Sequence, residues 1–414
     1  MAGAADALAG DDAPIGIQRG VTKDGGGPRS IFLMFLRIGL SAFGTGEAQV
    51  ARLRRALVDE RAWITSEGFA EIAVVANLLP GGAGLQIALA AGRERGGTAG
   101  GLAAGLGYLA PAALLAIVLG AGWSRLAGLV DGAWIHGAKA AGAAVVLQTI
   151  LTMGRRMVRG PIRIGIAAGA GVGLVLTTGP GAQMAALAVG AMFGCALLRD
   201  EAPASSRPSA FVTRAVLGGV AAFALLLAGL PIAAGLLNSP ELGLVGAAFR
   251  AGGFAVADGR MILPLIEAET HGRGWLSTDA ATAGFGLISA LPGPALAYAG
   301  FVGAAQDYVA WGWPGGLLAL AAATAPALLL AQAAAPIRAT LAASREATAA
   351  MAGLGATAVG VMSAFLWRTM LPAAISRPSD WALVGAAWIF LSIARLPAWA
   401  TVLGFAMATA IFRR

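Results

Sequence analysis

Two short segments rich in proline and glycine are the first candidates for chemistry. Pro80-Gly81-Gly82 and Pro292-Gly293-Pro294 each interrupt an apolar stretch of the chain. Such a break exposes the backbone N–H groups that begin the next helix, and these groups bind anions. The alternative is that the prolines only kink helices packed by their neighbours. Because the motif occurs twice, we favour an anion site.

Basic side chains inside apolar runs are the second set of candidates. Arg37 and Arg250 lie within such runs. An arginine at the bilayer centre costs at least about 2.5–3.5 kcal/mol, so it usually faces a cavity or a partner. Its guanidinium group can bind two oxygens of a tetrahedral oxyanion. The alternatives are snorkelling to the interface or pairing with Glu47 or Asp258. Lys139 is equally compatible with an interfacial and a functional role.

The residues around the two tips complete the candidate site. Either Glu47 or Asp258 could carry a coupling proton if it is buried, and each could equally be a plain salt-bridge partner. Small or amide-bearing residues flank the tips and could contact the ligand through backbone or side-chain hydrogen bonds. These are Gly44, Gly46, Asn77 and Gly259.

The sequence offers little for enzymatic or metal chemistry. The single cysteine, Cys195, cannot form an internal disulfide, and His136 and His271 cannot complete a metal cage with it. His136 is expected to be structural. The sequence has no GxxxxGK[ST] phosphate-binding loop, so we predict no ATP coupling. We also predict no cofactor. The net charge is +8, but few of the charges are clustered as on a nucleic-acid-binding surface, so we predict no nucleic-acid partner.

The composition places these residues in a membrane. Of 414 residues, 58% are hydrophobic and only 12% are charged, whereas soluble domains carry about 25% charged residues. We therefore predict an all-α protein that crosses the bacterial inner membrane several times. Runs near 20 residues can span its apolar core. They are 99–122, 134–153, 161–178, 182–198, 211–237, 313–335, 349–371, 380–395 and 397–412.

The chain contains an internal repeat. WITSEGFAEIAVVANLLPGG from Trp63 aligns with WLSTDAATAGFGLISALPGP from Trp275, and the tryptophan-to-proline interval is the same in both. Upstream, FLRIGLSAFGTG from Phe35 aligns with AFRAGGFAVADG from Ala248. The alignment pairs Arg37 with Arg250 and predicts a duplication.

The distribution of charge predicts that the two halves face opposite ways. Basic residues follow both early apolar stretches, 31–50 and 66–92, which cannot alternate sides under the positive-inside rule. Re-entrant hairpins that turn near Gly39–Gly46 and at Leu79–Gly82 resolve this conflict. The equivalent stretches 243–265 and 278–304 are followed mainly by acidic residues, as an inverted-topology repeat requires.

The predicted fold is therefore an inverted-topology repeat of two halves. Each half has two re-entrant or broken helical hairpins and about four transmembrane helices, and one transmembrane helix links the halves. The boundaries are 1–29 for a disordered cytoplasmic tail, 30–200 for the first repeat, 201–240 for the linker and its helix, and 241–414 for the second repeat. A homodimer remains open.

In the repeated motifs described above, the chain resembles the chromate ion transporters of the long-chain, two-domain type. The motifs that carry the resemblance are FLRIGLSAFG from Phe35, RRALVDERAWITSEGF from Arg54, NLLPGG from Asn77, GWLS from Gly274 and LPGP from Leu291. The resemblance implies export of chromate from the cytoplasm, with sulfate as a competitor. In the first-half tip, Gly82 stands where the family motif ends in proline.

Energetics also favour export. With the cell interior negative, each charge of a departing anion gains about 2.3 kcal/mol per 100 mV. We therefore expect a secondary transporter driven by the membrane potential, with ion exchange as a further contribution. The alternatives are uptake of sulfate or another inorganic anion, and a membrane enzyme or scaffold that transports nothing.

Overall fold

The computed structural model describes residues 27–177, 179–199, 214–256, 258–271, 273–309 and 311–412, and all regular elements among them are helical. The predicted tail lies outside the described residues except for its last three positions. Residues 201–213 of the predicted linker lie outside them as well.

The two halves contain corresponding series of helices. In the first half these are α1 Pro28–Leu40, α2 Gly46–Arg54, α3 Ser66–Leu78, α4 Ala83–Ala121, α6 Ala133–Met157, α7 Pro161–Leu176 and α8 Pro180–Leu197. Helix α9, Arg214–Leu237, follows. In the second half they are α10 Pro240–Phe254, α11 Ile262–His271, α12 Thr278–Ser289, α13 Tyr298–Ala305, α14 Trp313–Ala334, α16 Arg345–Phe365, α18 Pro378–Ser392 and α19 Ala398–Phe412.

Each predicted turn coincides with a break between helices. Helix α3 ends at Leu78 and α4 begins at Ala83, and between them Gly81 and Gly82 have φ of 92° and 85°. Backbone in this region is easy only for glycine. One boundary differs from the prediction, because 83–92 and 99–122 both belong to α4. That helix continues through a kink at Gly96–Gly97, where the dihedral angles are not helical.

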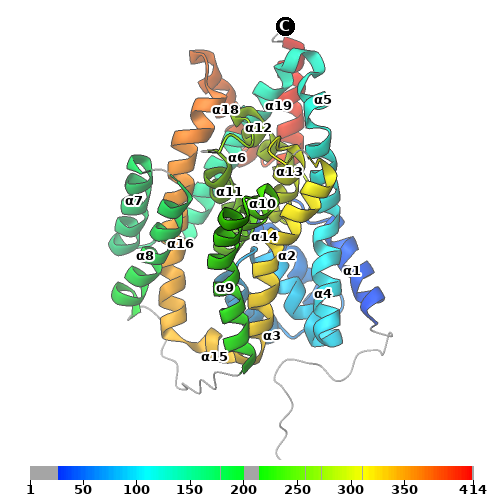
Figure 1. The fold of residues 1–414 in the computed structure, drawn as a ribbon, viewed down its shortest axis with the longest axis vertical. Coiled ribbons are helices and arrows are strands. Elements are labelled where there is room, and N and C mark those ends of the chain that lie inside the picture. The colour runs from blue at the N-terminus through cyan, green and yellow to red at the C-terminus, as the bar shows by residue number, and fades with distance from the viewer. Residues whose placement is uncertain are drawn as a thin grey trace, which may run out of the picture.

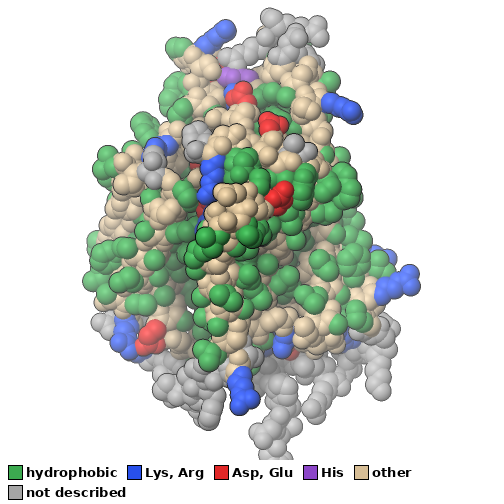
Figure 2. All heavy atoms as spheres, in the orientation of Figure 1, with side chains coloured by type: hydrophobic (Ala, Val, Ile, Leu, Met, Phe, Trp, Pro, Cys, Tyr) green, Lys and Arg blue, Asp and Glu red, His purple; other side chains and the backbone are tan. Residues whose placement is uncertain are grey.

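Several helices are suited to cross a membrane. Among the described residues, five are long and apolar enough: Ala83–Ala121, Pro180–Leu197, Val216–Leu237, Trp313–Ala343 and Arg345–Ala374. Figure 2 shows hydrophobic side chains over the middle of one face, with Lys and Arg side chains at its lower edge and near its top. The chain is a multi-pass membrane protein.

The helices of the two halves exchange packing partners. Helix α6 of the first half packs against α18 and α19 of the second, whereas α16 of the second half packs against α7 and α8 of the first (Figure 1). Within the halves, α1 packs on α4 and α10 packs on α14. Each of these two contacts depends on a glycine, because a Cβ atom at Gly39 or Gly252 would collide with the carbonyl oxygen of Tyr108 or Ala323.

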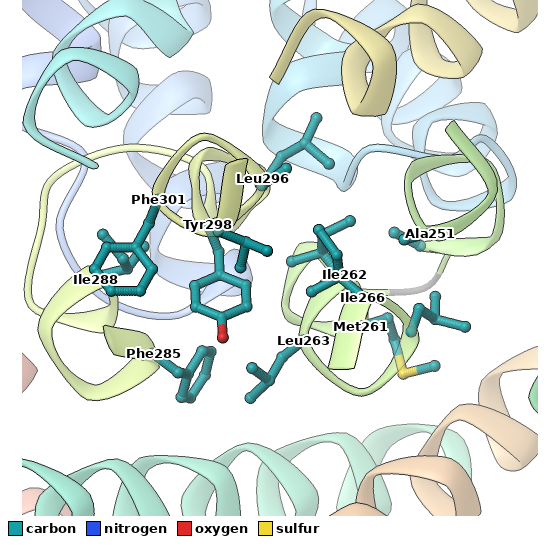
Figure 3. Close-up of a cluster of buried hydrophobic side chains, with 14 of the residues drawn as sticks. Ala251, Met261, Ile262, Leu263, Ile266, Phe285, Ile288, Leu296, Tyr298 and Phe301 are labelled. Carbon is teal, nitrogen blue, oxygen red and sulfur yellow. The ribbon is translucent and has the colours of Figure 1, made fainter. Parts of the chain in front are cut away.

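The second half contributes much of the apolar core. In Figure 3, Tyr298 of α13 lies close to Phe285 of α12 and Leu263 of α11, and Phe301 of α13 lies beside Ile288 of α12. The Tyr298 hydroxyl donates to the carbonyl oxygen of Ala281 at 2.8 Å, so this buried polar group is satisfied. The packed cluster fixes α11, α12 and α13, whose ends carry the breaks at the candidate site.

Candidate functional site

The four helix breaks of the two halves meet and exchange backbone hydrogen bonds. The N–H of Gly81 in the first half donates to the carbonyl oxygen of Ala255 in the second, at 3.0 Å. Reciprocally, the N–H of Gly293 donates to the carbonyl oxygen of Ala42, at 2.9 Å. Ala42 and Ala255 are equivalent in the sequence repeat. Each tip is therefore held by the other half.

The contact between the breaks requires small residues. A Cβ atom on Gly82 would lie only 2.9 Å from the Cα atom of Gly259, which is closer than real side chains approach backbone. The side-chain amide of Gln49 also holds this region. Gln49 donates through Nε2 to the Gly293 carbonyl at 2.8 Å and accepts from the Tyr108 hydroxyl at 3.0 Å.

A cavity of about 240 Å³, with both apolar and charged residues in its lining, lies beside this junction. Helices α2, α3 and α6 of the first half and the segment before α11 of the second half form its walls. The lining includes arginines, carboxylates, hydroxyls and one amide. These residues are Thr45, Glu47, Arg54, Asn77, Thr149, Thr152, Arg156, Asp258 and Arg260, with Gly46 and Gly259 at the breaks.

Arg260 is the buried cation of this cavity, with 5% of its surface exposed. Its Nη1 donates to Thr149 Oγ1 and its Nη2 to the Gly44 carbonyl oxygen, both at 3.2 Å. Its backbone N–H donates to Asp258 Oδ1 at 2.8 Å, so Asp258 caps the short 3-10 turn Gly259–Met261. Both side-chain bonds go to neutral oxygens, and within the described ranges no carboxylate forms an ion pair with this guanidinium.

Two other cations inside the helical bundle, Arg250 and Lys139, are paired with carboxylates. Arg250 binds both oxygens of Glu269, with two distances of 2.6 Å. Lys139 donates to Asp279 Oδ1 at 2.8 Å. The nearby Asp258 carboxylate acts on Arg260 electrostatically, but among the described residues no carboxylate is in ion-pair contact with the guanidinium. A buried guanidinium without such a contact is costly, so the site of Arg260 favours an anion from outside the chain.

Glu47 and Arg156 stand at the exposed part of the cavity. Arg156 Nη1 donates to Glu47 Oε1 at 3.4 Å, and about half of each side chain is exposed. Arg54 is exposed beside them. Two cations and one carboxylate thus give the cavity rim a positive balance.

The structure brings most of the predicted site residues together. Gly46, Asn77, Gly259, Glu47 and Asp258 line the large cavity. An adjoining small cavity is lined by other predicted residues: Gly44, Gly81, Gly82, Gly293 and Pro294. Pro80 and Pro292 are buried in the same breaks.

Three predicted cations lie elsewhere. Arg37 is on the exposed face of α1, and neither cavity includes it. Arg250 and Lys139 also lie outside both linings, in the ion pairs described above. Their positions in apolar runs predicted that these residues lie in the membrane. Which way each side chain points depends on helix packing, and the pattern of apolar residues did not predict that packing.

Sequence reasoning overlooked the most buried cation. Arg260 directly follows Gly259, in the same apolar stretch as Arg250, and the repeat pairs it with Glu47. An arginine in one half and a glutamate at the equivalent position of the other half indicate that the two halves contribute different charges to the site. Thr149 and Arg156 gave no local signal, because α6 reaches the tips only through the tertiary fold.

These features define a class of protein. A multi-pass helical chain that places broken helices and a buried arginine around a cavity lined in part by charged side chains is built as a membrane transport protein. The structure has no counterpart among solved structures at the level of similarity that would indicate a shared fold.

Comparison with known proteins identifies the family. The family model described as chromate transporter matches residues 29–198 and again residues 242–410. A chromate transport protein of Pseudomonas aeruginosa is 30% identical over 298 residues, which are 68% of this chain and 66%, just under two thirds, of that protein. A chromate transport protein of Cupriavidus metallidurans is 25% identical over 313 residues, 73% of this chain and 72% of the relative. The chain belongs to the chromate transporter family, and it is a transporter rather than an enzyme.

Proposed function

We propose that this chain is a secondary transporter that exports chromate and similar tetrahedral oxyanions from the cytoplasm of a bacterium. The observation that carries the proposal is Arg260, a buried guanidinium that lines the large cavity and has only neutral oxygen partners. An oxyanion would supply the charged hydrogen-bond acceptor that the guanidinium lacks, through paired hydrogen bonds. The names of the two relatives support chromate as the substrate.

The exposed side of the cavity supports the proposed direction of transport. Its exposed cations, Arg54 and Arg156, adjoin basic loops that the positive-inside rule places in the cytoplasm. A cytoplasmic anion would therefore meet an accessible, positively charged entrance. For a dianion the membrane potential adds about 4.6 kcal/mol per 100 mV in the outward direction, from 2.3 kcal/mol for each charge.

An inverted repeat is our proposal for how the site changes sides. It is supported by the opposite charge bias of equivalent loops, by the exchanged packing of α6 and α16, and by the reciprocal hydrogen bonds at Gly81 and Gly293. The helices before the breaks, such as α1 with 13 residues, are about 20 Å long at 1.5 Å per residue. That length is too short to cross a core of about 30 Å, so we propose that they are re-entrant.

Transport by everted membrane vesicles tests the function. Vesicles that carry the wild-type chain should accumulate chromate when their interior is made positive, and Arg260→Gln should reduce the rate at least tenfold, because a hydrogen bond to a charged group contributes about 1.5–3 kcal/mol. Arg159→Gln is the matched control, since Arg159 is exposed and bonds only a backbone carbonyl outside the cavity.

Two results would contradict the proposal. Accumulation by right-side-out vesicles alone would show uptake, the competing direction. Equal transport rates for the wild type and Arg260→Gln would show that Arg260 does not bind the transported anion.

A further inference from the structure

A second, smaller cavity lies inward of the large one, where all four breaks converge. Its volume is about 30 Å³, which is room for roughly two water-sized groups. The two cavities share Arg260, Asp258, Gly259, Gly46 and Ala83. An anion held by Arg260 in the large cavity is therefore at the entrance to the small one.

One buried hydroxyl in this inner cavity has no partner. Ser289, the last residue of α12, is 9% exposed, and its Oγ makes no hydrogen bond. Other buried hydroxyls in this chain behave differently. Those of Thr149, Thr282 and Thr324 each donate to the carbonyl four residues earlier, at 2.7 or 2.8 Å. A buried hydroxyl left unsatisfied is unfavourable, so Ser289 points to a ligand.

The wall of the inner cavity includes an uncapped helix start. Helix α4 begins after Gly82, and no side chain caps its first N–H groups. The first turn of α4, residues 83–85, lines the cavity together with Ser289. By contrast, Thr45 caps α2 and Asp258 caps the turn that precedes α11. An open helix N-terminus carries partial positive charge and free donors for an anion.

We infer that the inner cavity is a second oxyanion subsite, in which Ser289 is a specificity-determining residue. In this subsite one oxygen of the tetrahedral anion enters the small cavity and accepts hydrogen bonds from the Ser289 hydroxyl and from the first N–H groups of α4. Arg260 lines both cavities, so it holds the rest of the anion at the boundary between them. The inference rests on the proposed function and deepens it, since it concerns the same substrate class at the same junction.

The charges at the subsite are consistent with an anion. Asp258 is the one carboxylate in the lining, and its Oδ1 is already occupied by the backbone N–H of Arg260. Its charge therefore faces Arg260 and the helix turn that it caps. The small volume means that the anion must lose most of its water, and fixed donors such as Ser289 replace that water.

Binding of radiolabelled chromate to the purified full-length chain tests the inference. Ser289→Ala should weaken binding about tenfold, because one hydrogen bond to a charged group is lost. Thr324→Ala is the matched control. It also deletes a buried hydroxyl, but that hydroxyl bonds within its own helix and lines neither cavity. Thr324→Ala should bind chromate as the wild type does.

Thermal unfolding of the same proteins without anion separates a ligand contact from a structural one. The Ser289 hydroxyl has no internal partner, so Ser289→Ala should unfold at the wild-type temperature or above it. With chromate present, the variant should gain less stabilisation than the wild type.

Three other results would refute either the subsite or the proposed function. If the wild type binds chromate and Ser289→Ala binds it equally, the hydroxyl contacts only water and the subsite is refuted. A lower unfolding temperature for anion-free Ser289→Ala would assign the residue a structural role and refute the subsite too. If the wild type itself binds no oxyanion, the proposed function fails before the subsite is in question.

Discussion

The N–H of Gly81 donates a hydrogen bond to the carbonyl oxygen of Ala255, 3.0 Å away in the other half of the chain. The equivalent glycine of the second half, Gly293, bonds Ala42 in the same manner. A buried backbone group that loses its partner is unfavourable, so neither tip can move far unless the other adjusts. The two tips are therefore expected to move together, and a substitution that disturbs one tip should impair transport by the whole chain.

The close approach of the tips predicts a sensitive glycine. Gly82→Ala should abolish chromate transport, because its Cβ would lie 2.9 Å from the Gly259 Cα atom. Gly160→Ala is a matched control, since Gly160 has a φ of 84° against 85° for Gly82 and no atom within 4 Å of an added Cβ. Gly82 and Gly160 have ψ of 146° and 161°, so both substitutions place alanine in a backbone region that is nearly exclusive to glycine and carry a similar strain of about 1–3 kcal/mol. Vesicle transport should distinguish them, and equal loss in both would attribute the effect to strain alone.

The hypothesis of a coupling proton can be tested at Glu47, although it assumed a buried carboxylate and about half of the Glu47 side chain is exposed. If Glu47 carries the coupling proton, Glu47→Gln should make chromate export insensitive to an imposed pH gradient while some export driven by membrane potential persists. Glu60→Gln is the control, because Glu60 has the same 49% side-chain exposure and also pairs with an arginine, Arg52. Glu60 lies outside the cavity. An unchanged response to the pH gradient in Glu47→Gln would exclude this carboxylate as the proton carrier.

The pair Arg250–Glu269 predicts an effect on stability rather than on anion binding. Glu269 is fully buried, so Glu269→Gln should destabilise the chain by about 3–5 kcal/mol, the typical loss when one partner of a buried pair is removed. Glu346→Gln breaks an exposed pair with Arg199 and should leave the unfolding temperature nearly unchanged. Thermal unfolding in detergent measures both. If Glu269→Gln unfolded at the wild-type temperature and lost chromate binding, Arg250 would belong to the site after all.

The sequence predicted most of the helices and the positions where they are interrupted. Glycine and proline at Leu79–Gly82 and at Leu291–Pro294 interrupt helices through their own backbone preferences, which are local properties of the chain. The repeat then indicated which breaks correspond. The glycines and carboxylates at the tips were found for the same reason, since they sit within a few residues of the breaks.

The cations show where sequence reasoning stops. Arg37, Arg250 and Arg260 all lie in apolar stretches, and the same desolvation argument applies to each. Only the tertiary fold separates them, since Arg37 is exposed, Arg250 meets Glu269 and Arg260 reaches Thr149 of α6. The approach of α6 to the tips depends on packing between halves, which no local pattern in α6 predicts.

The measurement that tests the central claim most directly is the sidedness of two loops, because the anion site depends on halves that enter the membrane from opposite faces. The chain has a single cysteine, so Cys195→Ser provides a cysteine-free background. Asp59→Cys and Thr278→Cys, both at exposed positions, would then be labelled separately with a membrane-impermeant thiol reagent. We predict that the reagent labels Thr278→Cys only in intact cells and Asp59→Cys only in everted vesicles. Labelling of both cysteines from the same side would contradict the inverted arrangement and the oxyanion pathway built on it.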